Sequence, residues 1–137
     1  MRTGLRIRGS RGSREVRNAL LRYARWLRAR YEFPIRVPVY LSPHEKLISR
    51  EGVLCVATFF GPFDREVEPY IRISTGEYPA EKRKYGRDSA LAGYLRSLSH
   101  ELVHYYQWLA TGNCTERGVV VKADAMVARY ALDVDHP

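Results

Sequence analysis

Cysteine is scarce in this sequence, with two residues among 137, and long apolar runs are missing. The two cysteines, Cys55 and Cys114, are too few for the disulfide framework that stabilises many small secreted proteins. No stretch approaches the roughly 20 apolar residues of a membrane span, and the N-terminus has no apolar signal-peptide core. We therefore expect a cytoplasmic protein without a membrane segment.

Acidic residues are nearly missing from the start of the chain. Residues 1–30 contain ten arginines and one acid, Glu15, a local charge of +9, so the remaining residues carry −1 of the total of +8. Such a basic block can attract phosphate backbones. A solvated helix face with an Arg-rich tail accounts for the same charge, and no nucleic-acid reading motif accompanies it. Nucleic-acid binding through the Arg-rich first helix is therefore kept as an alternative.

Internal repeats are also missing, and the length suits one domain. We expect a flexible basic tail over residues 1–12, a single domain over 13–134 and a short tail over 135–137. Within the domain, apolar residues spaced by three and four predict a helix from Ser13 to about residue 31. Alternating and β-branched runs predict strands over residues 35–41, 52–60 and 69–75. Pro38 favours an edge position for the first of these strands.

The second half of the domain is predicted to be helical. Residues 76–88, which are charged and contain glycine and proline, predict a loop. A long helix follows from Asp88 or Ser89 to Gly112, and a last helix runs from Thr115 or Val119 to about Leu132. The order α-β-β-β-α-α predicts an α+β fold, with a small mixed sheet and helices packed on one of its faces.

The long helix carries the sequence His100-Glu101-Leu102-Val103-His104, which is an HExxH motif. Two histidines at i and i+4 lie on one face of a helix, one turn apart, so both imidazoles can reach one zinc ion. Glu101 is rotated to the side and can take a proton from a water that zinc activates. The motif therefore predicts a Zn²⁺ site with Glu101 as the general base.

The placement of the two histidines on this helix supports that interpretation. At 100° per residue, the leucines of the helix stay within about 40° of Leu91, whereas His100 and His104 fall at about 180° and 220°. The leucine stripe must face the core, so the histidines face away from it. Histidines that merely filled the core would share the leucine stripe.

The segment HELVHYYQW, together with the order of elements, resembles the minimal zinc peptidases called minigluzincins and the similar SprT-like metallopeptidases. The resemblance spans residues 13 to 134 and implies a compact zincin-like domain. It also implies that an edge strand aligns an extended peptide beside the active-site helix, a strand that here is expected at 69–75 or 35–41. His100 and His104 match the two histidine ligands of the family, and Glu101 matches its general base.

The third metal ligand departs from the family pattern. The resemblance implies a glutamate on the next helix, in a motif like E-x-x-A-(N/D)-x-(F/Y)-A, but Val120 stands at that position. Asp124 ranks first as a replacement ligand, since it follows His104 by 20 residues and its carboxylate suits zinc. Alternatively, Asp124 orients a histidine and Glu116 or a water completes the site.

These observations predict a zinc-dependent metallopeptidase that hydrolyses peptide bonds in a peptide or protein substrate. The alternative is a catalytically weak or inactive zincin-like protein. It would serve as a nucleic-acid-associated module, a role that the resemblance to SprT-like proteins also implies, or as a structural metal-binding module.

Overall fold

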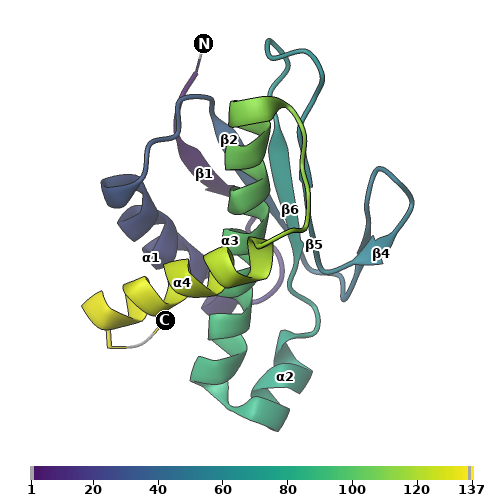
Figure 1. Cartoon of the computed structure of the whole chain (residues 1–137). Coiled ribbons are helices and arrows are strands. Elements are labelled where there is room, and N and C mark those ends of the chain that lie inside the picture. The colour runs from purple at the N-terminus through teal and green to yellow at the C-terminus, as the bar shows by residue number, and fades with distance from the viewer. Residues whose placement is uncertain (1, 136) are drawn as a thin grey trace.

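A four-stranded sheet forms one layer of the molecule, and the helices lie on one side of it (Figure 1). The structure is a computed structural model and describes residues 2–135 and 137. The strand order is β1-β2-β6-β5. Strand β2 runs parallel to both β1 and β6, whereas β5 is antiparallel to β6, so the sheet is mixed as expected. The bounds are β1 Leu5–Arg8, β2 Val37–Ser42, β5 Ala57–Phe60 and β6 Tyr70–Ser74.

A short hairpin stands apart from this sheet, between β2 and β5 in the sequence. It consists of β3 (Leu47–Ile48) and β4 (Leu54–Cys55), paired antiparallel. Figure 1 shows it projecting to the side of the sheet that carries β5. The predicted strand over 52–60 is therefore two strands, β4 and β5, that belong to different sheets.

The core lies between the sheet and two helices, α1 (Arg14–Arg30) and α3 (Arg87–Thr111). Ser13 begins α1 as the sequence predicts, because its side chain accepts a hydrogen bond from the Val16 N–H. The leucine stripe of α3 is buried against the sheet. The Tyr23 hydroxyl hydrogen-bonds Ser99 at 2.6 Å and thereby joins the two helices next to the HExxH motif. Within the described part of the chain, no helix combines the length and apolarity needed to cross a bilayer.

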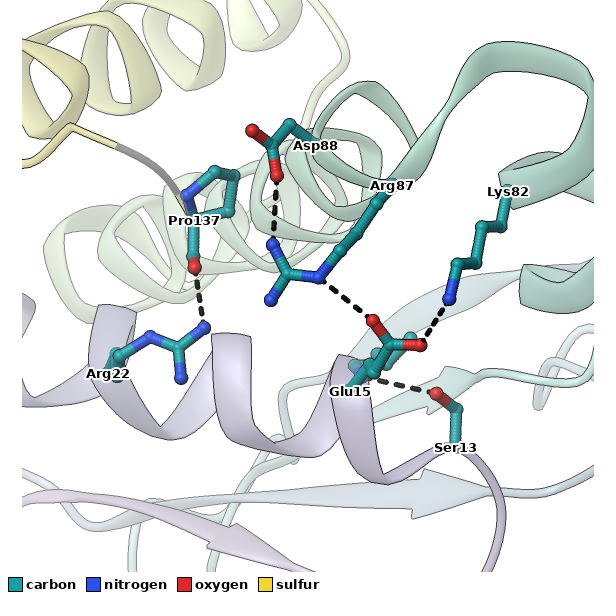
Figure 2. A network of polar contacts seen from close by, with 8 residues as sticks. Ser13, Glu15, Arg22, Lys82, Arg87, Asp88 and Pro137 are labelled. Carbon is teal, nitrogen blue, oxygen red and sulfur yellow. Dashed lines mark hydrogen bonds and ion pairs between the residues drawn. The ribbon is translucent and has the colours of Figure 1, made fainter.

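The remaining helices are α2 (Tyr78–Tyr85) and α4 (Val119–Asp133), and α4 crosses α3 in Figure 1. Helix α2 occupies residues that the sequence predicted as a loop, so that prediction is wrong for residues 78–85. At the surface, Glu15 of α1 accepts hydrogen bonds from Lys82 of α2 at 2.8 Å and from Arg87, the first residue of α3, at 2.9 Å (Figure 2). These contacts between distant segments are invisible to local sequence patterns.

The start of the chain also differs from the prediction. Leu5–Arg8, placed by the sequence in a flexible tail over 1–12, form β1, and the Leu5 side chain is fully buried. Strand β2 consequently has a neighbour on each side and is not an edge strand despite Pro38. A strand residue donates to only one neighbour, so Pro38 withholds a single ladder bond. The predicted tails also include Met1 and His136, which lie outside the described residues.

Candidate metal centre

His100 and His104 of α3 converge on the carboxylate of Glu116. The His100 Nε2 atom lies 3.0 Å from one carboxylate oxygen, and the His104 Nε2 atom lies 2.9 Å from the other. One ligand atom from each residue lies within 4.8 Å of the others, close enough for one metal ion to bind all three. This is the single group of three potential metal ligands found among the described residues. The two histidines are thus brought together as the motif predicts.

Glu116 belongs to the connection between α3 and α4, which runs over residues 112–118. This segment leaves α3 at Gly112, whose φ of 81° is the left-handed conformation that glycine adopts freely. The chain then turns back along α3 and brings Glu116 over the histidines. The Glu116 side chain is 73% exposed, whereas the His104 side chain is 9% exposed. The centre therefore opens to solvent on the side of Glu116.

Gln107 positions both His104 and the segment that carries Glu116. Its amide oxygen lies 2.9 Å from His104 Nδ1 and also accepts from the Thr115 N–H at 3.1 Å. Its amide nitrogen donates to the Thr115 carbonyl at 3.1 Å. A partner on one ring nitrogen fixes the orientation of the imidazole and directs the other nitrogen outward. The sequence prediction missed this role, although Gln107 follows His104 by one helical turn and shares its face.

Each imidazole nitrogen needs a hydrogen atom or a metal ion between it and the carboxylate. Imidazole nitrogen and carboxylate oxygen both carry lone pairs, so at hydrogen-bond distance they repel unless a proton or a cation lies between them. Here one carboxylate meets two imidazoles whose Nε2 atoms point to the same place. A proton on each ring or one shared metal ion satisfies this arrangement. The donor set of two imidazoles and one carboxylate is one that catalytic zinc sites use.

Glu101 lies beside this group and faces the sheet rather than solvent, with 7% of its surface exposed. Burial raises the pKa of Glu101 from its ordinary value of 4.5 to about 7, and the Glu116 carboxylate adds to this increase. His104 and the Phe59 N–H act in the opposite direction. A carboxylate with a pKa near neutrality is suited to take up and release a proton.

Two hollows share His100 and Glu101 in their walls. Each hollow contains one of the two candidate third ligands. Glu116 lines the hollow that also contains His104. Asp124 lines the neighbouring hollow, together with Val120. Asp124 is not a member of the converging group, so the geometry does not support the ranking of Asp124 before Glu116. The alternative ligand, Glu116, is the carboxylate that the fold brings to the histidines.

Strand β5 forms one wall of both hollows, and its position corrects the expected substrate strand. The segments 69–75 and 35–41 became β6 and β2, which are interior strands. Among residues 2–135 and 137, strand β5 pairs with β6 alone, so its other edge is free there. Residues 57–59 of β5 line the hollow that contains His100, Glu101 and His104. An edge strand thus lies beside the motif, but it is β5 and neither of the two expected segments.

The raised pKa of Glu101 predicts how the stability of the metal-free protein changes with pH. The folded state favours the neutral carboxyl, so this stabilisation is complete below pH 4.5 and is lost as the pH rises through about 7. We expect the free energy of unfolding to fall by about 3 kcal/mol over this window. Urea denaturation in the presence of a chelator measures it. The Glu101→Gln variant should lack this decline, and an equal decline in that variant would contradict the assignment.

Comparison of the chain with protein-family models, with curated proteins and with solved structures gave no match. The function is therefore argued from the geometry of the centre.

Proposed function

We propose that this protein is a zinc-dependent hydrolase of peptide bonds, with His100, His104 and Glu116 as metal ligands and Glu101 as the general base. The observation that carries the proposal is the convergence of both His Nε2 atoms on one carboxylate, at 3.0 and 2.9 Å, next to a buried glutamate. Neither the converging ligands nor the buried glutamate alone would support this proposal. Converging ligands are also found in structural metal sites, and buried carboxyls also occur without a metal.

The donor set fits a catalytic rather than a structural zinc site. Structural sites are closed by four protein ligands, mostly cysteines, whereas catalytic sites have three protein ligands and one open position. Three ligands converge here, and Glu116 lies on the solvent side of the group. Cys114 lines the same hollow, but its side chain sulfur lies 3.5 Å from the His104 carbonyl oxygen and is not a member of the converging group.

Glu101 and Gln107 have different roles in the proposed hydrolysis. When bound, zinc supplies a Lewis acid that polarises the substrate carbonyl and acidifies a water molecule. Glu101 accepts the proton of the attacking water and then delivers it to the leaving amine. The burial of Glu101 strengthens its basicity. Gln107 holds the His104 ring in place through Nδ1.

A peptide is the substrate class that suits the free edge of β5. An extended peptide can add to a sheet edge through its main-chain hydrogen bonds, and such pairing places its carbonyl groups in a regular row. The β5 edge borders the hollow with His100 and Glu101, so a paired peptide would pass directly over the centre. This mode of binding depends on hydrogen bonds to the peptide backbone, so it favours unfolded segments over folded proteins.

Zinc binding by purified variants tests the proposal. We expect wild-type protein to bind one zinc ion per chain. His104→Ala and Glu116→Ala should each lose at least about 100-fold in affinity, because removal of a ligand exceeds the 10–100-fold loss typical of its supporting contacts. Competition with a chromophoric chelator measures the affinity.

Asp124→Ala is the matched control, since it removes a carboxylate near the centre that we do not assign as a ligand. It should retain the wild-type affinity. A large loss in Asp124→Ala with none in Glu116→Ala would show that the ligand assignment is wrong. If wild-type protein binds no zinc at all, the proposed function fails.

A further inference from the structure

The sheet has a second face, opposite the helices, and its side chains include arginines and three aromatic residues. Side chains alternate along a strand, so residues that neighbour the buried ones point to this outer face. Val39 and Ile71 are fully buried against the helices, and Phe59 packs against Trp108 of α3. Tyr40, Tyr70 and Phe60 therefore lie on the outer face.

These three aromatic residues form a continuous group, which we call the aromatic row. The ring centroids of Tyr40 and Tyr70 are 6.1 Å apart, and those of Tyr70 and Phe60 are 5.1 Å apart. The row therefore crosses three adjacent strands, β2, β6 and β5. Tyr40 is 45% exposed, which is unusual for a ring in the middle of a sheet. A face that served only as a solvated surface would not need three neighbouring rings.

Arginines accompany the aromatic row on both sides. Tyr40 is paired in register with Arg8 of β1 and with Arg72 of β6. The guanidinium of Arg50 stacks over the Phe60 ring at 4.2 Å from its centroid. Of the ion pairs formed by residues 2–135 and 137, none includes these three arginines. Arg72 donates to the Ile48 carbonyl, whereas Arg8 and Arg50 are exposed, so their charge is available to an external anion.

Acidic residues are missing from the strands beneath this surface. None of β1, β2, β5 and β6 contains an aspartate or a glutamate. Glu68, two residues before β6, is neutralised by Arg36 at 2.8 Å. Two arginines of α1 have partners within the chain, since Arg28 donates to the Leu5 carbonyl and Arg30 pairs with Asp133. The outer face thus combines the positive charge of Arg8 and Arg50 with one exposed and two half-buried rings.

We propose that the outer face of the sheet binds single-stranded nucleic acid, with bases stacked on the aromatic row and phosphates bound by Arg8 and Arg50. Proteins that bind single strands combine aromatic platforms with cationic side chains that follow the backbone. A flat sheet face cannot enter a groove of a duplex, which normally admits a helix or a narrow ribbon. The site is separate from the metal centre, which lies on the helix side.

Binding of a labelled oligothymidylate of about 20 nucleotides to the full chain tests this inference by fluorescence anisotropy. We expect Tyr40→Ala to weaken binding by about 5- to 100-fold, the effect of losing one stacked base. Arg8→Glu should weaken binding and reduce the salt dependence of the affinity by about one phosphate contact. A duplex of the same length should bind more weakly than the single strand.

Two variants on α2 serve as matched controls. Tyr85→Ala removes an exposed tyrosine, and Arg83→Glu makes the same change of charge as Arg8→Glu. Both should bind the oligonucleotide with nearly wild-type affinity. Equal losses in the test and control variants, or no binding at 50 mM salt, would overturn the inference. So would sedimentation as a dimer that Tyr40→Ala dissociates, because the outer face would then bind a second copy. Since Arg8 is exposed, Arg8→Glu keeps the test valid if Tyr40→Ala does not fold.

Discussion

Replacement of Glu101 by glutamine is expected to reduce peptide hydrolysis by about 10²- to 10⁴-fold, the usual contribution of a positioned general base. The amide has nearly the same shape, but it cannot take a proton from water. Zinc should remain bound, because Glu101 is not a member of the converging group. Hydrolysis of a fluorescein-labelled unfolded protein by the zinc-loaded variant measures the effect.

Glu45→Gln is the matched control for this substitution. Glu45 is exposed and lies on the loop after β2, away from the metal centre, so its replacement should leave hydrolysis unchanged. Zinc content is measured in both variants to separate chemistry from metal binding. Full activity in Glu101→Gln would refute the role of Glu101, whereas loss of zinc in this variant would make Glu101 a structural part of the centre.

Replacement of Trp108 by alanine is expected to reduce the free energy of unfolding by about 3–5 kcal/mol. Trp108 is 2% exposed and packs against Phe59 of β5. Its indole N–H donates to the Pro62 carbonyl at 2.9 Å, and the guanidinium of Arg65 covers the ring at 4.4 Å. Gly61 leaves room for the ring, since a Cβ atom there would lie 2.5 Å from the indole. Trp108 therefore joins α3 to the segment that follows β5.

Thermal and urea denaturation of Trp108→Ala and Phe63→Ala provide the measurement. Phe63 lies on the same segment but is fully exposed, so its loss should change the free energy of unfolding by less than about 0.5 kcal/mol. Because both residues are aromatic and only Trp108 is buried, the difference between the two variants reports the effect of burial. Similar stabilities for Trp108→Ala and the wild type would show that β5 is held against α3 by other contacts.

The candidate metal centre illustrates which part of a site can be predicted from sequence. The spacing of His100 and His104 on a helix fixes their separation locally, and the leucine stripe fixes the face on which they lie. Their convergence was therefore predictable, and the structure places them as expected. The carboxylate beside them was kept only as an alternative, because the ranking of Asp124 assumed a return on the next helix. Glu116 reaches the histidines from the turn before α4, and Gln107 holds that turn in place.

The sheet likewise has features that were predictable from sequence and features that were not. Alternation within each segment predicted the strands around residues 35–41 and 69–75, but no local pattern states which strands are neighbours. Leu5–Arg8 is too short and too basic to be recognised as a strand, and it becomes one because its Leu5 side chain fills the core beside α1. The addition of β1 moves β2 into the interior and leaves β5 as the free edge beside the histidines.

The sequence by itself therefore determined the helix that carries the motif, the face on which the histidines lie and the chemistry that their spacing allows. These properties depend on interactions within a few residues, which repeat with the period of a helix or a strand. Only the tertiary structure decided which carboxylate meets the histidines, which strand edge borders them and which rings gather on the outer face. Each of those depends on the return path of a connection or on strand order, and both are set by packing between segments far apart in the chain.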